Sequence, residues 1–494
     1  MSKAKALMLQ GTGSGVGKSL LSAGLCRLLA RRGYRVAPFK AQNMALNSAV
    51  TPEGLEIGRA QAYQAEAAGI LPEARMNPIL LKPTADSASQ VIIMGQARGN
   101  LKAKDYYRRF EEHWRVVRQA YDSLSQDYEV IVIEGAGSPA EINLQAREIV
   151  NMRMAAYAKA RVYIVGDIDR GGVFAWLKGT YDLIPQEYRD LIKGFIINKF
   201  RGDIALLRPA LEMFAQIVPV PIIGVVPYLH NLLVDEEDGV YVRDGGSERA
   251  ELKIAIVRLP RIANFTDFLP LALEPDVAIS YIRRPEELDG ADLIIIPGSK
   301  ATVSDLIWLW DCGLARAIIE AAQAGKPVVG ICGGYQMLGE EVLDPQGVEA
   351  KVSRARGLGL LPLKTTFEGV KVLQNLDQEL EVPLLRYRGR TRGYEIHMGR
   401  SHLQGEAEPL FPERPDLGFW RSRPFVIGTY LHGLFDNDEL RRALLNQIRA
   451  LKGLPPLKDG IKYRKLRQKE FDRLADLVEN HIDLKALFEA LELK

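Results

Sequence analysis

Cysteine and histidine are scarce in this sequence, with three cysteines and six histidines among 494 residues. The cysteines are Cys26, Cys312 and Cys332, and no two of them form a CxxC pair. The sequence therefore offers neither a disulfide framework nor a zinc site. Because so few of these side chains exist, each can be judged as a candidate for chemistry by its own surroundings.

Long apolar runs and an excess of charge are also missing. No window holds 18 uncharged apolar residues, and the segment MSKAKALMLQ lacks the apolar region of a secretory signal, so we expect a cytoplasmic protein without a membrane partner. The net charge is only +3, which gives no electrostatic basis for binding nucleic acid. Small molecules are the expected partners, and a homo-oligomer is left open.

The length exceeds what one hydrophobic core normally serves, and strands alternate with helices through most of the chain. We predict an α/β protein with two doubly wound, mostly parallel-sheet domains in tandem and a helical C-terminal tail. A charged, glycine-containing stretch before Lys253 marks the break between them. The predicted division is a first domain at 1–235, a linker at 236–250, a second domain at 251–445 and the tail at 446–494.

The N-terminal domain begins with a phosphate-binding pattern. The segment GTGSGVGKS, from Gly11 to Ser19, follows an apolar strand and precedes a helix. Glycines let successive backbone N–H groups approach phosphate oxygens, Lys18 would reach the outer phosphates of ATP, and Ser19 would hold Mg²⁺. Five residues rather than the usual four separate Gly11 from Gly17. The predicted ATP-binding residues of this loop are Gly11, Thr12, Gly13, Gly15, Val16, Gly17, Lys18 and Ser19.

Further polar residues lie at the carboxyl ends of predicted strands, where parallel sheets bind their ligands. Lys40 could neutralise a phosphoryl group in transit, and Glu134 is placed to meet the metal ion together with Ser19. Asp167, Asp169, Asn198 and Lys199 follow later strands. We expect Asn198 and Lys199 to contribute to ATP binding by contacting the adenine.

The second domain contains a cysteine in a strand-to-helix turn. Cys332 lies between Gly330 and Gly334 in a G-x-C-x-G arrangement, which resembles a nucleophile elbow with sulfur in place of a hydroxyl. The following helix favours the thiolate. Cys26 and Cys312 lack such surroundings and are assigned to packing.

A thiolate that attacks an acyl carbon needs a base and an oxyanion hole. The predicted strand Phe425–His432 delivers His432 as the base, and His397 is the rival. Backbone N–H groups at Gly333 and near Gly298 and Ser299 are the expected oxyanion donors. Elsewhere, helices are predicted for Glu56–Ala68 and within Arg98–Ser125, and the apolar spacing of Phe471, Leu474 and Val478 predicts a tail helix docked on the protein.

These motifs resemble known families over nearly the whole chain. The lengthened phosphate loop and the segment EGAG (Glu134–Gly137) resemble the dethiobiotin synthetase-like ATPases, and the second half resembles class I glutamine amidotransferase domains. Three segments resemble the cobyric acid synthase family within the cobyrinic acid-amidating enzymes: PFKAQNMALNS (38–48), VGDIDRGGVF (165–174) and GYEIHMG (393–399). Usual class I domains carry Glu two residues after the histidine, whereas Leu434 stands here. Glu395 is the candidate to orient His432.

The resemblance implies amidation of the b, d, e and g carboxylates of adenosylcobyrinic acid a,c-diamide, with glutamine as the nitrogen source. It implies ATP and Mg²⁺ but no tightly bound organic cofactor. Lys40, Asn43, Asp167 and Asp169 would then serve the acyl phosphate and the substrate. Three alternatives stay open: an a,c-diamide synthase, an ATPase switch resembling ParA and MinD, and a second domain that only binds a partner.

Overall fold

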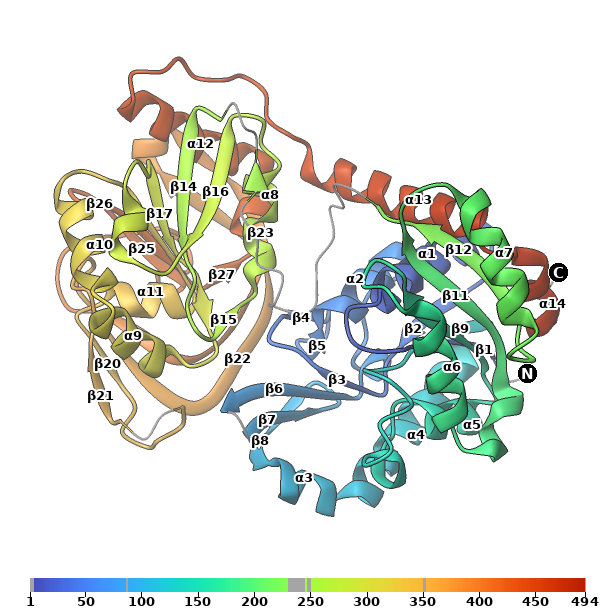
Figure 1. Cartoon of the computed structure of the whole chain (residues 1–494). Helices are drawn as coiled ribbons and strands as arrows, with labels where there is room; N and C mark the ends of the chain where they lie inside the picture. Colours follow the sequence, from blue (N-terminus) through green and yellow to red (C-terminus); the bar gives the residue numbers. More distant parts are fainter. Residues whose placement is uncertain (1–3, 86–87, 230–244, 247–249, 350–351, 494) are drawn as a thin grey trace. The chain divides into compact units, whose positions relative to one another are not determined.

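The computed structural model describes residues 4–85, 88–229, 245–246, 250–349 and 352–493, which group into two compact units (Figure 1). Within them, the first unit comprises Met1–Ala45, Leu55–Asp235 and Arg467–Lys494, and the second comprises Leu46–Gly54 and Glu236–Leu466. The predicted linker lies outside the described residues except for 245–246 and 250. The short segment Leu46–Gly54, which the sequence analysis placed within the N-terminal domain, groups with the second unit. The division predicted from the sequence stays a prediction.

The first unit is built on a six-stranded, wholly parallel sheet. Its strands, in spatial order, are β12 (Ile222–Pro227), β11 (Ile192–Phe200), β10 (Arg161–Asp167), β1 (Lys5–Gly11), β9 (Val130–Glu134) and β2 (Val36–Phe39). The chain order reverses around β1, which lies between β9 and β10. Loops after these strands meet at one edge of the sheet, where ligands of such folds bind.

Helices surround this sheet, and the tail helices pack on it. The helices are α1 (Lys18–Arg31), α2 (Arg59–Ala67), α3 (Ala103–Arg108), α4 (Phe110–Asp127), α5 (Met152–Ala158), α6 (Val173–Leu183), α7 (Ile204–Ala215), α13 (Tyr463–His481) and α14 (Leu484–Leu491). Val478 of α13 and Leu487 of α14 join one buried cluster with Leu7 of β1. Phe471, Leu474 and Val478 are all buried, which confirms the predicted docking of the tail.

A smaller sheet corrects one of the two helices predicted in this part of the chain. It contains β3 (Gln42–Met44), β6 (Ile79–Ala85), β7 (Ala88–Ile93) and β8 (Gln96–Lys102), so helix within Arg98–Ser125 begins only at Ala103. Met94 and Gly95 both have positive φ and form a tight turn between β7 and β8. The helix predicted from Glu56 begins at Arg59, because Glu56–Gly58 forms the strand β5.

The second unit contains an eight-stranded mixed sheet. Its strands, in spatial order, are β13 (Gly245–Gly246), β16 (Val277–Ile282), β14 (Leu252–Val257), β17 (Leu293–Ile296), β19 (Val328–Ile331), β26 (Phe425–Thr429), β25 (Gly418–Ser422) and β24 (Glu408–Pro409). The five strands from β16 to β26 are parallel, and those at the edges are antiparallel. The fold is therefore α/β in both units, as predicted.

Both faces of this sheet are buried. Ala255 and Val257 of β14 belong to one apolar cluster, whereas Ile254 and Ile256 belong to another. Alternate side chains of a strand point to opposite faces, so two layers cover the sheet, as in a doubly wound fold. The helices of this unit are α8 (Leu269–Ala272), α9 (Thr302–Asp311), α10 (Leu314–Gln323), α11 (Gly333–Leu338) and α12 (Asp438–Leu451).

Further strands flank the nucleophile. A five-stranded sheet contains β21 (Arg354–Arg356), β20 (Glu341–Leu343), β22 (Leu363–Val382), β23 (Tyr387–Leu403) and β27 (Leu431–His432), and a two-stranded one contains β15 (Ile262–Ala263) and β18 (Gly298–Ser299). The single strand predicted for Phe425–His432 is thus divided at Tyr430, because Leu431 and His432 pair with β23 of another sheet. Along the described chain, no helix is long and apolar enough to cross a membrane.

Candidate active sites

The phosphate loop connects β1 to α1 and requires its glycines. Gly17 precedes α1 with φ of 98°, and a Cβ there would lie 2.2 Å from the Asn198 Nδ2 atom. A Cβ on Gly11 would lie 2.9 Å from the Lys18 Nζ atom. Lys18 donates to the backbone oxygens of Gly13 (2.9 Å) and Gly137 (3.3 Å). The lysine is therefore folded back over its own loop.

Asn198 and Lys199 hold the loop from β11. The Asn198 Nδ2 group donates to the Val16 oxygen over 2.8 Å, and the Lys199 Nζ group donates to the Gly15 oxygen over 2.7 Å. Both residues lie beside the nucleotide-binding loop, as the sequence indicates. Their contact with an adenine stays a prediction.

Glu134, at the end of β9, is the centre of a buried polar cluster. Its carboxylate accepts from the Ser19 hydroxyl (2.9 Å), from Lys40 (2.9 Å) and from the Gln64 amide (2.6 Å). Burial alone raises the pKa of Glu134, but the Lys40 ammonium, the Gln64 amide and Lys18 outweigh it and lower this pKa. The carboxylate is therefore ionised at neutral pH.

The contact between the Ser19 hydroxyl and the Glu134 carboxylate provides oxygen ligands that suit a magnesium ion bound together with a nucleotide. One hydroxyl and one carboxylate are hard oxygen ligands, and Mg²⁺ usually takes few ligands from the protein, adding phosphate oxygens and waters. Gln64 was not identified from the sequence. Nothing in the segment RAQAYQAEA (Arg59–Ala67) marks Gln64 as the partner of a buried carboxylate, so the sequence carried no signal for it.

The other predicted residues of this unit make contacts outside the Glu134 cluster, and the Asp169 backbone N–H donates to the Asp167 carboxylate over 3.0 Å. Asp167 pairs with Lys199 over 2.9 Å, and Asp169 pairs with Arg201 over 2.8 Å. Asn43 donates to the Gln61 side chain over 3.0 Å. Asp167 is thus linked to the phosphate loop through Lys199, whereas roles for Asn43 and Asp169 remain predictions.

In the second unit, Cys332 occupies the sharp turn between β19 and α11. Its φ is 52° and ψ is −108°, a strained conformation for a residue with a side chain. A Cβ on Gly334 would lie 2.0 Å from the Ile296 oxygen, so only glycine fits there. The geometry is that of a nucleophile elbow, with the thiol buried and directed at the Ile396 oxygen over 3.5 Å.

His432 lies beside this thiol and is oriented by Asp267. The His432 Nδ1 atom is 2.6 Å from Asp267 Oδ2, so it carries the proton and Nε2 is left to face the sulfur. Burial lowers the pKa of His432, but the Asp267 carboxylate and the hydrogen-bonded Cys332 raise it to about 9. The Tyr394 ring stacks on the imidazole.

Asp267 replaces Glu395 as the residue that orients the base, so that expectation was wrong. Glu395 instead faces His397, with 3.4 Å between Oε2 and Nε2, and Arg414. Asp267 belongs to a 3-10 helix (Phe265–Phe268) after β14. In the sequence Asp267 lies ten residues beyond β14, with the short antiparallel strand β15 in between, so no local pattern pointed to it.

His397 is held away from this role. Its Nδ1 atom is 3.0 Å from the Gly399 oxygen, its Nε2 atom faces Glu395, and its ring stacks on Tyr430. Both ring nitrogens therefore have partners other than the thiol. His432 is the histidine that the structure places against Cys332.

The predicted oxyanion segments converge on the elbow. A Cβ on Gly333 would lie 2.8 Å from the Ser299 backbone nitrogen, and a Cβ on Gly298 would lie 3.8 Å from the Cys332 Cβ atom. The Ser299 hydroxyl donates to Asp305 over 2.7 Å, and burial raises the pKa of Asp305 to about 6. Gly333 and the Gly298–Ser299 segment therefore lie close to Cys332, and their role as oxyanion donors stays a prediction.

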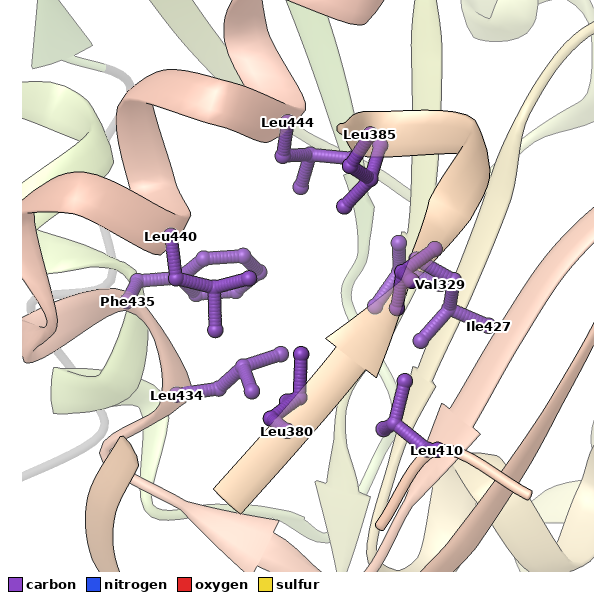
Figure 2. Close-up of a pocket in the computed structure, with 10 residues that line it drawn as sticks. Val329, Leu380, Leu385, Leu410, Ile427, Leu434, Phe435, Leu440 and Leu444 are labelled. Atoms are coloured by element: carbon purple, nitrogen blue, oxygen red, sulfur yellow. The ribbon is translucent and has the colours of Figure 1, made fainter. Parts of the chain in front are cut away.

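An apolar pocket lies elsewhere in the second unit (Figure 2). Its lining comes from β19, β22, β26 and α12 together with the segments beside them, and consists of Val329, Leu380, Val382, Leu385, Leu410, Ile427, Leu434, Phe435, Leu440 and Leu444. None of these side chains carries a polar group that could orient glutamine. All ten belong to one core cluster, so the pocket is a gap in the packing.

Two family models match the chain in tandem. Residues 7–240 match the CobQ/CobB/MinD/ParA nucleotide binding domain, and residues 253–440 match the CobB/CobQ-like glutamine amidotransferase domain. Curated relatives named cobyric acid synthase match almost end to end. Those of Citrobacter koseri and Salmonella arizonae are 46% and 47% identical, each over 99% of this chain and 98% of the relative. That of Desulfitobacterium hafniense is 48% identical over 97% of this chain and 96% of its own.

A phosphate-loop domain and a cysteine amidotransferase domain in one chain define a glutamine-hydrolysing amidoligase. With close relatives matched over nearly their whole length, the chain belongs to the cobyric acid synthase family of cobalamin biosynthesis. Membership implies ATP, glutamine and a corrinoid as substrates.

Proposed function

We propose that this chain amidates the b, d, e and g carboxylates of adenosylcobyrinic acid a,c-diamide, with ATP as the energy source and glutamine as the nitrogen donor. The observation that carries the proposal is the cysteine site, in which Cys332, His432 and Asp267 are aligned, within a chain that belongs to this family. ATP would act with Mg²⁺ at the phosphate loop, and we propose that the reaction takes place in the cytoplasm.

Glutamine hydrolysis would begin with attack of the Cys332 sulfur on the side-chain amide carbon. The backbone N–H groups of Gly333 and the Gly298–Ser299 segment would stabilise the oxyanion. His432 would pass a proton from Nε2 to the leaving nitrogen, which departs as ammonia and leaves a glutamyl thioester. The same imidazole would then remove a proton from the water that hydrolyses the thioester. Asp267 would hold the imidazole in the required tautomer.

Amide synthesis would use the phosphate-loop site. The carboxylate oxygen of the corrinoid attacks the γ-phosphorus of ATP, ADP leaves, and ammonia then displaces phosphate from the acyl phosphate with loss of a proton. Ser19 and Glu134 would hold Mg²⁺, which neutralises phosphate charge when bound. Lys18 and Lys40 would bind developing charge on the transferred group, with Asp167 and Lys199 fixing the loop.

The alternatives differ in what they leave without a role. An a,c-diamide synthase would share both sites but modify other carboxylates, so only the substrate separates the two. An ATPase switch would leave the aligned cysteine site unused, and a C-terminal domain that only binds a partner would do the same. The strained elbow favours catalysis, because backbone strain costs stability and is retained where it has a chemical use.

Mass spectrometry of the corrinoid product tests the proposal. Adenosylcobyrinic acid a,c-diamide is incubated with the protein, ATP, Mg²⁺ and glutamine, and in parallel with Cys332→Ala and with an ammonium salt. Four successive acid-to-amide conversions are expected, lost in the variant with glutamine and restored by ammonia. No conversion in any arm by folded protein, together with conversion of cobyrinic acid itself, would favour the a,c-diamide synthase.

A further inference from the structure

Asn264 lies at the catalytic edge of His432. Its Nδ2 atom is 3.4 Å from His432 Nε2, the nitrogen that serves the sulfur. The residue precedes the 3-10 helix that carries Asp267, and it has a left-handed backbone with φ of 53° and ψ of 38°. Its side chain is buried. Asn264 therefore touches the base from the side opposite to its Asp267 contact.

The orientation of this amide is fixed by Ser48. The Ser48 backbone N–H donates to Asn264 Oδ1 over 3.0 Å. A backbone N–H can only donate, so the amide atom that faces it must be the oxygen. The amide NH₂ group must then face His432. This assignment follows from hydrogen-bond chemistry, which removes the usual ambiguity between the two ends of an asparagine amide.

The segment that carries Ser48 is itself held in place. Asn375 of β22 donates to the backbone oxygens of Thr51 (2.8 Å) and Val50 (3.3 Å). Val50 packs in a small apolar cluster with Tyr394, whose ring stacks on His432. Hydrogen bonds and apolar packing thus hold Leu46–Gly54 in the second unit, and they fix the position of the Ser48 N–H donor.

We propose that Asn264 is a positioning residue for glutamine hydrolysis: Ser48 turns its amide so that an N–H group faces His432 Nε2 and opposes a proton there. A donor facing a protonated nitrogen is repelled, whereas a neutral imidazole accepts from it. Asp267 and Cys332 favour the imidazolium, and among the residues that the structure describes Tyr394 is the other ionisable group against the ring. Asn264 would offset these charges and drive the proton from Nε2 to the nitrogen that leaves as ammonia.

The inference rests on the proposed glutaminase role of Cys332 and His432, and two substitutions test it. Asn264→Gly removes the amide at a left-handed position that glycine adopts without strain. Asn264→Asp keeps an acceptor for Ser48 but presents a carboxylate oxygen to Nε2. Asn446→Asp is the matched control, since the Asn446 side chain hydrogen-bonds the Leu457 backbone.

The readout is the pH profile of kcat/KM for glutamine hydrolysis, whose alkaline limb reports loss of the proton from the thiol–imidazole pair. We expect this limb to move upward by about half a pH unit or more in Asn264→Gly, further in Asn264→Asp, and not in Asn446→Asp. A purely structural role would lower the rate at every pH and leave the alkaline limb in place. That result would overturn the inference. A downward shift in Asn264→Asp would also overturn it.

Two measurements distinguish a misfolded variant, a failure of the proposed glutaminase function and a failure of the Asn264 inference. Thermal melts show whether each variant is folded at the assay temperature, and if Asn264→Asp is not, Asn264→Gly decides alone. Hydrolysis of glutamine by Cys332→Ala would contradict the proposed function itself. Abolished hydrolysis in Cys332→Ala with an unmoved alkaline limb in the folded Asn264 variants would contradict this inference alone.

Discussion

At the scale of single residues, each site depends on a buried ionisable side chain whose partners decide its charge. Glu134 is kept ionised by Lys40 and Gln64, and His432 is kept protonated by Asp267 and Cys332. Burial opposes the charge in both cases. Removing one partner therefore changes the chemistry more than the packing.

Replacing Asp267 by asparagine should disable glutamine hydrolysis. The imidazole would lose its preferred tautomer and the stabilisation of its charge, and the comparable change in serine protease triads costs about 10⁴-fold in kcat. Steady-state glutaminase assays measure this loss, and ammonium-dependent amidation should persist. Glu395→Gln is the matched control, because Glu395 contacts His397 and Arg414 instead. An equal loss in both variants would contradict the assigned role of Asp267.

Replacing Glu134 by glutamine should lower the rate of ATP-dependent amidation roughly 10²-fold or more, with either glutamine or ammonium as the nitrogen source. The change removes the charge that would hold Mg²⁺ and that now pairs with Lys40. Amidation with an ammonium salt measures the effect, and glutamine hydrolysis by the same variant is the internal control. Full amidation activity in Glu134→Gln would exclude the proposed metal role.

The Asp267–His432 pair should also make stability depend on pH. The pKa of His432 in the folded chain is about 9, above its ordinary 6.5, so its contribution is complete below pH 6.5 and lost as pH rises through 9. The loss should be on the order of 1–3 kcal/mol. Urea titrations from pH 6 to 10 measure the free energy of unfolding of the wild type and of His432→Gln. The difference between the two should become smaller as the pH rises. A difference that is constant with pH would contradict the raised pKa.

At the scale of elements, the elbow requires close approach of a strand, a turn and a helix. Gly334→Ala should prevent this approach, because the new Cβ would lie 2.0 Å from the Ile296 oxygen. We expect a lower melting temperature, from a cost of about 1–3 kcal/mol or more, and loss of glutamine hydrolysis. Gly369→Ala, where a Cβ would meet nothing within 4 Å, should change neither. A fully active Gly334→Ala variant would contradict the elbow geometry.

Elements with a local glycine or apolar pattern could be predicted from the sequence. The phosphate loop and the elbow follow from residues next to one another in the chain, and the docked tail follows from helical spacing. Strand β8 could not be predicted in the same way: Gln96–Lys102 is largely exposed and lacks an apolar pattern, and it becomes a strand only by pairing with β7 after the Met94–Gly95 turn.

Residue pairs that only the tertiary fold brings together could not be predicted from the sequence. Asp267 is 165 residues from His432, and Ser48 is 216 residues from Asn264. No spacing rule connects such pairs, so Glu395, which is closer in sequence to His432, was the wrong choice. Gln64 was missed because an uncharged side chain on an alanine-rich helix carries no sign of a buried carboxylate partner.

At the scale of the whole molecule, one chain holds two chemistries that share only ammonia. In the proposed mechanism, cysteine attack and hydrolysis would release the nitrogen in the second unit, and phosphoryl transfer would activate the carboxylate in the first. The central claim is that nitrogen released at Cys332 becomes the amide nitrogen of the corrinoid. Product formation alone does not establish this claim, whereas the isotope of the nitrogen does.

The most direct test uses glutamine labelled with ¹⁵N in its side-chain amide. Wild type is incubated without ammonium, and Cys332→Ala with the same glutamine plus unlabelled ammonium, each with ATP, Mg²⁺ and adenosylcobyrinic acid a,c-diamide. Mass spectrometry should find ¹⁵N in every new amide made by the wild type and only ¹⁴N in those made by the variant. Incorporation of ¹⁵N by Cys332→Ala, or its absence from the wild-type product, would contradict the account.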